Sequence, residues 1–141
     1  YGNLTLFNCL DRIFNCPKSN IMAQHNLFGI KAEEKALEYL LKKGYCLLEK
    51  NYRYGHAEVD LLMQKNGYLI CVEVKARSTD FYGLPESFIN AKKIKLIVSV
   101  VDHYLEHSEL DLEVRFDVIG IIKKRDNWII KHIKNAFYAW E

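Results

Sequence analysis

The chain has 141 residues, of which 50% are hydrophobic and 27% are charged. This composition is typical of a globular domain and excludes a disordered, highly charged tail. The 20 Lys and Arg residues nearly balance the 18 Asp and Glu residues, which gives a formal net charge of +2. A uniformly cationic coat on nucleic acid is therefore excluded, whereas a local basic patch is not.

The length predicts one domain, and we expect residues 1–21 to lie outside it. These residues lack the apolar stretch of a secretory signal, and no apolar run in the sequence is long enough to span a membrane. We therefore expect a cytoplasmic protein with reduced cysteines and no membrane partner. We also expect translation to begin at Met22, so that 22–141 form the domain. The alternative is a genuine N-terminal extension with an amphipathic segment over 4–14.

Hydrophobic spacing and turn residues predict two helices and five strands. In chain order, we expect a helix over 29–43, strands over 46–54, 58–63 and 68–76, a helix over 88–106, and strands over 112–122 and 127–133. Gly44 is expected to end the first helix, and Asn66-Gly67 to form a two-residue hairpin loop. The resulting α-β-β-β-α-β-β order predicts an α+β fold, an α/β sandwich with a mixed central sheet.

Glu33 interrupts the apolar stripe of the first predicted helix. It lies three residues after Ile30 and four residues before Leu37, which are both positions of the stripe. A carboxylate on a buried helix face is costly unless it is paired, hydrogen-bonded or bound to a cation. A cation site and a structural salt bridge with an arginine at the edge of the core are the two alternatives.

Acidic side chains also oppose one another across the predicted hairpin. With Asn66-Gly67 as its loop, the register places Asp60 opposite Glu73 and Glu58 opposite Lys75. Directly opposed residues have Cβ atoms about 4.5–5.5 Å apart, so two carboxylates at this spacing repel unless a positive charge lies between them. A longer loop would shift the register and separate the two acids.

We expect the apolar residues of these two strands to form the core behind the acidic cluster; they are Val59, Leu61, Val72 and Val74. Carboxylate oxygens at fixed spacing suit a hard divalent cation such as Mg²⁺ or Mn²⁺. A lysine beside them can help to deprotonate a metal-bound water and can stabilise charge on a phosphate under attack. The alternative is a solvated sheet face held by ordinary salt bridges.

Basic residues near the predicted site are candidates for contacts with phosphate. Arg77 continues the strand face of Glu73 and Lys75, and Lys92 and Lys93 lie near the start of the second predicted helix. Phosphate oxygens are the usual partners of such side chains in complexes with nucleic acid. A solvated basic surface is the alternative interpretation.

Two histidines of the second predicted helix have the spacing of a metal-binding pair. His103 and His107 are four residues apart and share one helix face. The residues between them, Tyr-Leu-Glu, do not form the HExxH pattern of zinc proteases. We interpret both as surface histidines at the end of a helix.

Four stretches of the sequence together resemble one bacterial family. They are 29–36, Gly55-His-Ala-Glu-Val-Asp60, Cys71-Val-Glu-Val-Lys-Ala-Arg77 and Arg115-Phe-Asp117. They resemble the YraN family of uncharacterised bacterial proteins, which is placed in the restriction-endonuclease-like PD-(D/E)xK nuclease superfamily and is similar to archaeal Holliday-junction resolvases. The resemblance covers about residues 27–120 and implies a restriction-endonuclease-like core.

The resemblance also implies roles for individual residues. Asp60 and Glu73 would hold Mg²⁺, and Lys75 would be the lysine of the motif. Glu33 would be the helix carboxylate that completes the site. Glu58 is expected to support the ligands without binding the metal itself.

The predicted function is Mg²⁺-dependent hydrolysis of phosphodiesters, on DNA rather than RNA, with branched or structured DNA as a candidate substrate. Two alternatives remain open: a nucleic-acid-binding protein of nuclease fold with little or no cleavage activity, and a metal-free structural or interaction module. Two departures from the family pattern, Ala57 for the usual glycine and Ala76 for a frequent threonine, remove no ligand. A homodimer, as resolvases form, is a candidate assembly.

Overall fold

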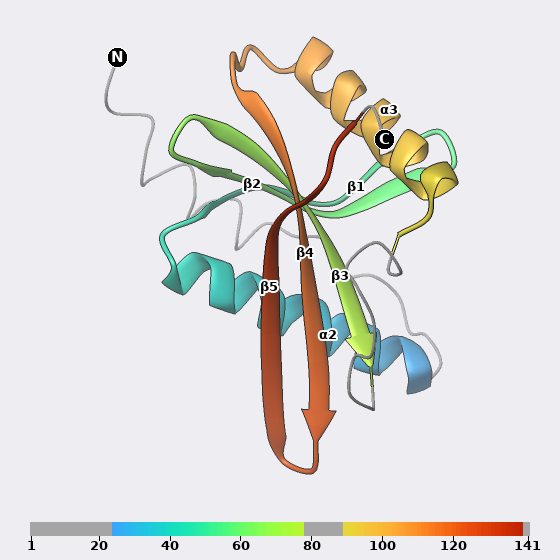
Figure 1. Cartoon of the computed structure of the whole chain (residues 1–141), viewed down its shortest axis with the longest axis vertical. Coiled ribbons are helices and arrows are strands. Elements are labelled where there is room, and N and C mark those ends of the chain that lie inside the picture. The colour runs from blue at the N-terminus through green and yellow to red at the C-terminus, as the bar shows by residue number, and fades with distance from the viewer. Residues whose placement is uncertain (1–23, 78–88, 140–141) are drawn as a thin grey trace.

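The computed structural model of the chain describes residues 24–77 and 89–139. In these ranges, five strands form one sheet of order β1-β2-β3-β4-β5, and two helices pack on it (Figure 1). The elements are α2 (Gln24–Lys42), β1 (Cys46–Tyr54), β2 (Ala57–Lys65), β3 (Tyr68–Arg77), α3 (Ala91–His107), β4 (Glu113–Lys124) and β5 (Asn127–Phe137). The predicted α-β-β-β-α-β-β order is confirmed, and the prediction for 1–21 falls outside the described residues.

The sheet is mixed, as predicted. Neighbouring strands are antiparallel except for β3 and β4, which run parallel and are joined by a crossover that contains α3. Asn66 and Gly67 have φ of 51° and 81°, and Lys65 pairs with Tyr68 across them. This is the two-residue loop with two left-handed residues that Asn-Gly favours, so the predicted hairpin and its register are confirmed.

Helix ends differ from the predicted ones by a few residues, for local reasons. α2 begins at Gln24, upstream of the predicted Gly29, and Phe28 in this added turn stacks on Trp128 with ring centroids 5.6 Å apart. α3 begins at Ala91 because Asn90 caps it: the side chain of Asn90 accepts the Lys93 N–H at 2.9 Å. This cap fixes where the first turn of α3 meets the sheet.

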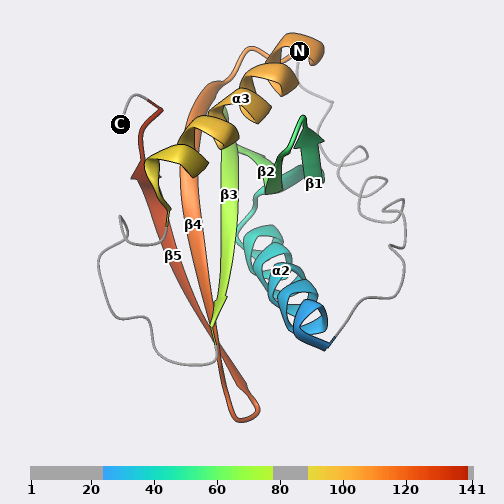
Figure 2. The same ribbon diagram turned by 90° about the vertical axis from the view of Figure 1, so that its right-hand side faces the viewer.

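Two apolar cores lie on opposite faces of the sheet, one under each helix (Figure 2). On the α2 side, Ala32, Ala36 and Leu40 pack against residues of β2, β3 and β4. On the α3 side, the buried helix residues are Ile94, Ile97, Val100, Val101 and Tyr104. Burial of each large aliphatic side chain contributes roughly 1.5–3 kcal/mol, so the two helices are held mainly by this packing.

β2 changes faces at Asp60, which corrects one expectation. Leu61 packs in the α2-side core as predicted, but Val59 lies in the α3-side core. Residues two apart on a regular strand share a face, so the pleat of β2 is interrupted between them. Asn51 of the neighbouring strand β1 has a left-handed φ of 51°, and the ladder between β1 and β2 shows no pair for Asn51 or Asp60.

The described helices include none that is long and apolar enough to cross a membrane. Cys71 is a buried free thiol, as expected. Cys9 and Cys16 lie outside the described residues.

Candidate metal centre

The backbone pairing between β2 and β3 stops at the acidic residues. The ladder ends at Leu61↔Val72, and the next pair in this register would be Asp60 with Glu73. Instead, the Asp60 carboxylate accepts the Val74 N–H, with Oδ2 2.7 Å from the nitrogen. A side chain thus replaces the backbone acceptor that β2 would otherwise supply. We call this place, formed by Asp60, Glu73 and Val74, the β2–β3 fork.

Glu73 is the least accessible acidic residue of the fork, with 4% of its surface exposed. Its Oε1 pairs with two lysines, Lys75 at 3.0 Å and Lys93 at 2.9 Å. Its Oε2 is buried and has no hydrogen-bond partner in the described part of the chain. A buried carboxylate oxygen without a partner costs free energy, so it needs an explanation such as a bound cation or water.

Lys93 reaches the fork from the first turn of α3. Burial alone would lower the pKa of Lys93, but the ion pair with Glu73 and the charge of Asp60 outweigh that effect, and the pKa is raised. Lys93 is therefore firmly cationic at neutral pH. The prediction that it contacts phosphate stays a prediction, and in this structure its partner is Glu73.

Asp60 is held in conditions that disfavour its charge. Burial raises the pKa of Asp60 to about 7, and the neighbouring charge of Glu73 adds to the effect. The Val74 N–H acts in the opposite direction, and the charge of Glu33 raises the pKa further. Closely spaced carboxylates with a raised pKa are common at functional sites, and they also occur in structural ion-pair networks.

Glu33 approaches the fork from α2 and is held by a residue that the sequence analysis missed. With its amide nitrogen turned toward the acids, Asn51 donates to Glu33 Oε2 and to Glu58 Oε1, each at 3.2 Å. Burial raises the pKa of Glu33, and the charge of Lys50 opposes this shift. The arginine salt bridge that we considered for Glu33 does not occur among the described contacts; an amide and a lysine take that place. An asparagine at a central strand position was the available signal, because asparagine tolerates a left-handed backbone.

The predicted opposition of Glu58 and Lys75 is wrong. Before the fork, β2 pairs with β1 only, and Glu58 lies opposite Arg53 and forms an ion pair with it. Lys75 lies one strand away and pairs with Glu73. The register argument failed here because it assumed a hairpin that stays regular beyond Leu61.

The donor set at the fork suits a divalent cation. The charges of Glu33 and Glu73 both raise the pKa of Asp60, so the three carboxylates interact. Across 24–77 and 89–139, however, no three His, Cys, Asp or Glu side chains converge to hold an ion by themselves. Mg²⁺ is usually bound by one or two carboxylates together with water and substrate phosphate. Asp60 and Glu73, with its unpartnered Oε2, fit that requirement.

Lys75 belongs to a row of residues that crosses the sheet. The strand pairings set Lys75 beside Gly120, and Gly120 beside Lys131. The isoleucines that flank Gly120 and Lys131 on their strands pack on the α2 side, so the row lies on the α3 face. Neighbouring strands are about 4.8 Å apart, which places the two lysines about 10 Å apart with no side chain between them.

The remaining predicted contact residues are exposed. Lys92 lies on the outer surface of the first turn of α3. Arg77 ends β3, and its guanidinium donates to the Ala76 carbonyl at 2.9 Å. Ala57, where the family usually has glycine, is buried in the α3-side core, so its methyl group is accommodated.

A second buried carboxylate lies on the other face of the sheet, at a bulge in β5. Asp117 accepts two hydrogen bonds from Arg115 at 2.9 Å, one from His132 Nε2 at 2.8 Å and one from the Asn135 N–H at 3.0 Å. Arg115 also donates to the Tyr45 hydroxyl at 3.1 Å. Burial would raise the pKa of Asp117, but these hydrogen bonds outweigh it, and the pKa is lowered. We call this group the Asp117 network.

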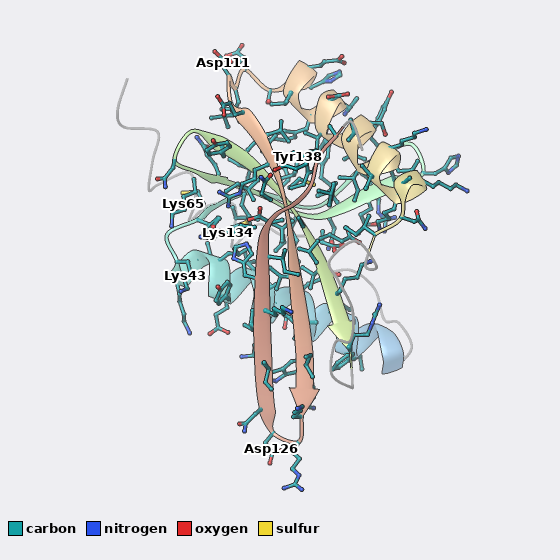
Figure 3. All side chains as sticks on the ribbon, viewed as in Figure 1. Lys43, Lys65, Asp111, Asp126, Lys134 and Tyr138 are labelled. Atoms are coloured by element: carbon teal, nitrogen blue, oxygen red, sulfur yellow. The ribbon has the colours of Figure 1, made fainter. Side chains whose placement is uncertain are left out.

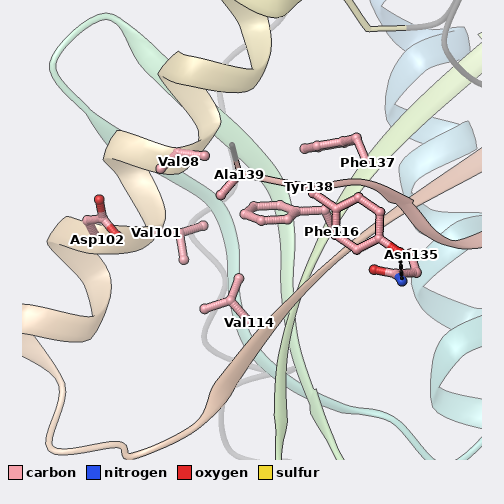
Figure 4. Close-up of a pocket in the computed structure, with 9 residues that line it drawn as sticks. All are labelled: Val98, Val101, Asp102, Val114, Phe116, Asn135, Phe137, Tyr138 and Ala139. Carbon is pink, nitrogen blue, oxygen red and sulfur yellow. Dashed lines mark hydrogen bonds between the residues drawn. The ribbon is translucent and has the colours of Figure 1, made fainter. Parts of the chain in front are cut away.

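A cavity of about 260 Å³ lies between α3 and the sheet (Figure 4). Most of its lining is apolar, and Asp102, Asn135 and Tyr138 add polar groups to it. None of the predicted site residues lines it, and the carboxylates of the fork lie outside it. The cavity is therefore separate from the candidate site.

Comparison with known proteins identifies relatives over most of the sequence. The uncharacterised protein family UPF0102 matches residues 32–121, which include the fork and Glu33. A UPF0102 protein of Christiangramia forsetii is 50% identical over 117 residues, which cover 83% of this chain and 98% of that protein. UPF0102 proteins of Flavobacterium psychrophilum and Parabacteroides distasonis are each 44% identical; the matches cover 83% and 84% of this chain and 98% of each relative.

Proposed function

This chain belongs to the uncharacterised protein family UPF0102, the YraN family that its sequence resembles, and from that premise we propose that it is a metal-dependent nuclease. The proposed reaction is hydrolysis of phosphodiesters in DNA, at the β2–β3 fork. Since the family is uncharacterised, membership supplies no activity, and the site must supply it. The proposal includes a restriction-endonuclease-like classification of the fold, which the element order and the position of the fork support.

One observation carries the proposal: Glu73 Oε2 is buried without a partner, and its carboxylate interacts with that of the half-buried Asp60. A structural ion-pair network would satisfy this oxygen, because a buried, unsatisfied acceptor only destabilises the fold. A cation-binding site must keep such an oxygen free. Asp60 and Glu73 would hold Mg²⁺ or Mn²⁺, and Glu33 would add negative charge from α2.

The cation would supply a Lewis acid for the phosphate and a water of lowered pKa. The residues of this chain would position the other groups. Asp60 is fixed by the Val74 N–H, so its second oxygen has a defined direction. Lys75 and Lys93 bring two positive charges to Glu73, where they would attract a phosphodiester and stabilise the charge that develops on it.

Cleavage assays test the proposal most directly. Plasmid, single-stranded and four-way-junction DNA would be incubated with Mn²⁺ or Mg²⁺, with EDTA as the metal-free control. Glu73→Gln and Lys75→Met are expected to reduce the cleavage rate at least about 100-fold, the usual cost of losing one group that stabilises a transition state. Glu38→Gln is the matched control, since Glu38 pairs only with Lys35 and Lys42 on the α2 surface. Cleavage that persists in both site variants overturns the proposal.

A second function is favoured by one specific observation: Glu73 Oε1 is already paired with two lysines. A protein that binds nucleic acid without cleaving it could use this neutralised arrangement. Binding of DNA without cleavage in any metal would support it. If calorimetry detects neither Mn²⁺ nor Mg²⁺ binding and no nucleic acid binds, a metal-free structural module is the remaining interpretation. A homodimer, which would present two forks to a branched DNA, is part of the primary proposal and is checked by sizing in solution.

A further inference from the structure

Three aromatic rings form a continuous stack between β1 and α3. The ring of Tyr54 stacks on His103 with centroids 4.0 Å apart and planes 15° apart. His103 in turn stacks on His107, with centroids 4.1 Å apart and planes 29° apart. We call Tyr54, His103 and His107 the ring stack. It lies outside the fork, and the proposed hydrolysis does not use it.

Tyr52 and the His103 carbonyl hold the ring stack in place. The Tyr52 hydroxyl lies 2.9 Å from His103 Nδ1, and the Tyr52 ring packs edge-on against the buried Tyr104. His107 Nδ1 lies 2.8 Å from the His103 carbonyl oxygen. The nitrogen lone pairs of two stacked imidazoles lie in nearly parallel planes, so they do not meet at one ion. This arrangement does not favour the metal pair that the histidine spacing suggested.

The outer end of the stack is open. Tyr54 is 47% exposed although His103 covers one face of its ring, so the opposite face and the edge provide that exposed surface. The other large exposed hydrophobic residues of the described ranges lie on other elements, so Tyr54 is not part of a broad apolar patch. Its neighbour Arg53 points to the opposite face of β1 and pairs with Glu58, so it does not flank the ring. A single exposed ring without a broad apolar patch around it fits the flat face of a nucleobase better than it fits a protein surface.

The ring stack and the fork lie on the same hairpin. Tyr54 pairs with Ala57, and Asp60 follows three residues later on β2. At about 3.3 Å per residue, the Tyr54 end lies roughly 10 Å from Asp60 along the strand. This corresponds to a few nucleotides of a DNA strand whose phosphate lies at the fork. The Glu58–Arg53 ion pair and Asn51 connect the two places.

We propose that the open face of Tyr54 stacks an unpaired base of the strand that is bound at the fork. The substrate class is then DNA with unpaired bases beside the bound phosphate, either single-stranded or splayed at a branch, and not continuous duplex. In a duplex, each base is covered by its neighbours and cannot reach a protein ring. This inference rests on the proposed function, because the phosphate at the fork sets the position of the base.

Binding in Ca²⁺, a hard cation that carboxylates bind and a weaker Lewis acid than Mg²⁺, tests the inference with a cation at the fork. The probe is a single-stranded oligonucleotide with 2-aminopurine in place of one adenine, compared with the same sequence as a duplex. We expect the wild-type protein to quench the fluorescence of the single strand on binding. Tyr54→Ala should weaken single-strand binding at least about fivefold and abolish the quenching, with duplex binding unchanged, while Tyr54→Phe should behave as wild type. Tyr138→Ala, which removes another exposed tyrosine, is the matched control.

Several outcomes overturn the inference: equal single-strand binding by wild type and Tyr54→Ala, equal weakening of single-strand and duplex binding, or no single-strand binding by the wild type. If Tyr54→Ala unfolds, Tyr54→Leu replaces it, since leucine keeps an apolar contact with His103 but presents no ring. Failure of the two proposals is distinguishable. If Tyr54→Ala cleaves DNA with the same selectivity as the wild type, only the stacking role is wrong. If binding depends on the Tyr54 ring but no DNA is cleaved, only the proposed hydrolysis is wrong.

Discussion

Glu73 and Asp117 are both buried carboxylates on neighbouring parallel strands, but their oxygens differ in how many hydrogen-bond partners they have. All the hydrogen bonds that Asp117 needs come from Arg115, His132 and the Asn135 backbone, and its pKa is lowered. At the fork, Glu73 keeps one oxygen unpartnered, and the pKa of its neighbour Asp60 is raised. The two regions lie on opposite faces of the same sheet.

The difference separates a structural site from a candidate functional one. A fully hydrogen-bonded carboxylate stabilises the fold and fixes the β5 bulge, but it has no lone pair left for a ligand. Repelling carboxylates destabilise the fold until a cation joins them. Both places combine a buried carboxylate with basic side chains, so the presence of opposite charges alone would not have distinguished them.

The largest expected effect is the loss of the Asp117 network. Asp117→Ala leaves Arg115 and His132 without their shared partner, so the free energy of unfolding should fall by about 3–5 kcal/mol. Urea unfolding followed by circular dichroism measures this. Glu38→Ala on the α2 surface should change it far less, because its ion pairs with Lys35 and Lys42 are exposed to solvent. A change below about 1 kcal/mol in Asp117→Ala would contradict the structural role.

Added metal should stabilise the fork and leave the Asp117 network unaffected. Mn²⁺ at a hundred times its dissociation constant should raise the free energy of unfolding by about 2.7 kcal/mol. Glu73→Gln should abolish this increment, whereas Asp117→Asn should keep it despite a lower starting stability. Thermal unfolding with Mn²⁺ and with EDTA measures the increment in each variant. An increment that survives in Glu73→Gln would place the metal elsewhere.

One chemical change should have opposite signs in the two regions. In EDTA, Asp60→Asn removes a charge that is repelled by Glu73 but keeps an oxygen for the Val74 N–H, so stability should rise by roughly 1 kcal/mol. Asp117→Asn removes a charge that Arg115 and His132 stabilise, so stability should fall. The urea midpoints of the two variants, each compared with that of the wild type, give the sign of each stability change. Shifts of the same sign would show that the two environments are not different.

The pH dependence of stability should contain a separate contribution from each of the two regions. The pKa of Asp117 is lowered from 3.8, so its contribution is present above that pH and is lost as the pH falls through the folded value. The pKa of Asp60 is raised to about 7, so the folded protein binds the proton more tightly, and metal-free stability should fall as the pH rises from about 4 to 7. Unfolding in EDTA from well below pH 3.8, where Asp117 is protonated, up to pH 7 measures both slopes. Asp60→Asn should remove the second slope only.

The smallest expected effect is a change in the salt dependence of DNA binding, and it distinguishes two adjacent residues on opposite faces of β5. Lys131 belongs to the row that begins at Lys75, whereas His132 belongs to the Asp117 network. Lys131→Gln should reduce the slope of log binding constant against log salt for DNA by about one unit, as expected for one lost phosphate contact. Lys43→Gln at the far end of α2 should leave the slope unchanged. Figure 3 shows the position of Lys43.

Regular local signals predicted most of the fold. The apolar periodicity gave the order of the elements, and Asn66-Gly67 gave the hairpin with the correct pairing as far as Leu61↔Val72. The alternation along β3 also predicted correctly that Glu73 and Lys75 share a face. These predictions succeeded because each depends on residues that are neighbours in sequence.

The contacts at the fork could not be predicted in the same way. Asp60 leaves the ladder for the Val74 N–H, and Val59 turns to the other core as a consequence. The pair between Lys93 and Glu73 was not predicted, because the Asn90 cap and the packing of α3 bring the two side chains together. Asn51 and the Asp117 network depend on partners from other strands or across a bulge, so no spacing in the sequence indicates them.

The sequence by itself thus determined an α+β fold and the order of its elements, with acidic residues and a lysine on adjacent strands, since periodicity and turn chemistry act over a few residues. The tertiary structure decided which carboxylate oxygens have hydrogen-bond partners. Asp117 acquires its partners from β4, from β5 and from the β5 bulge, whereas Glu73 Oε2 is left without one at the point where β2 parts from β3. Satisfaction of a buried oxygen depends on three-dimensional packing, and it is this property that distinguishes the candidate site from the scaffold.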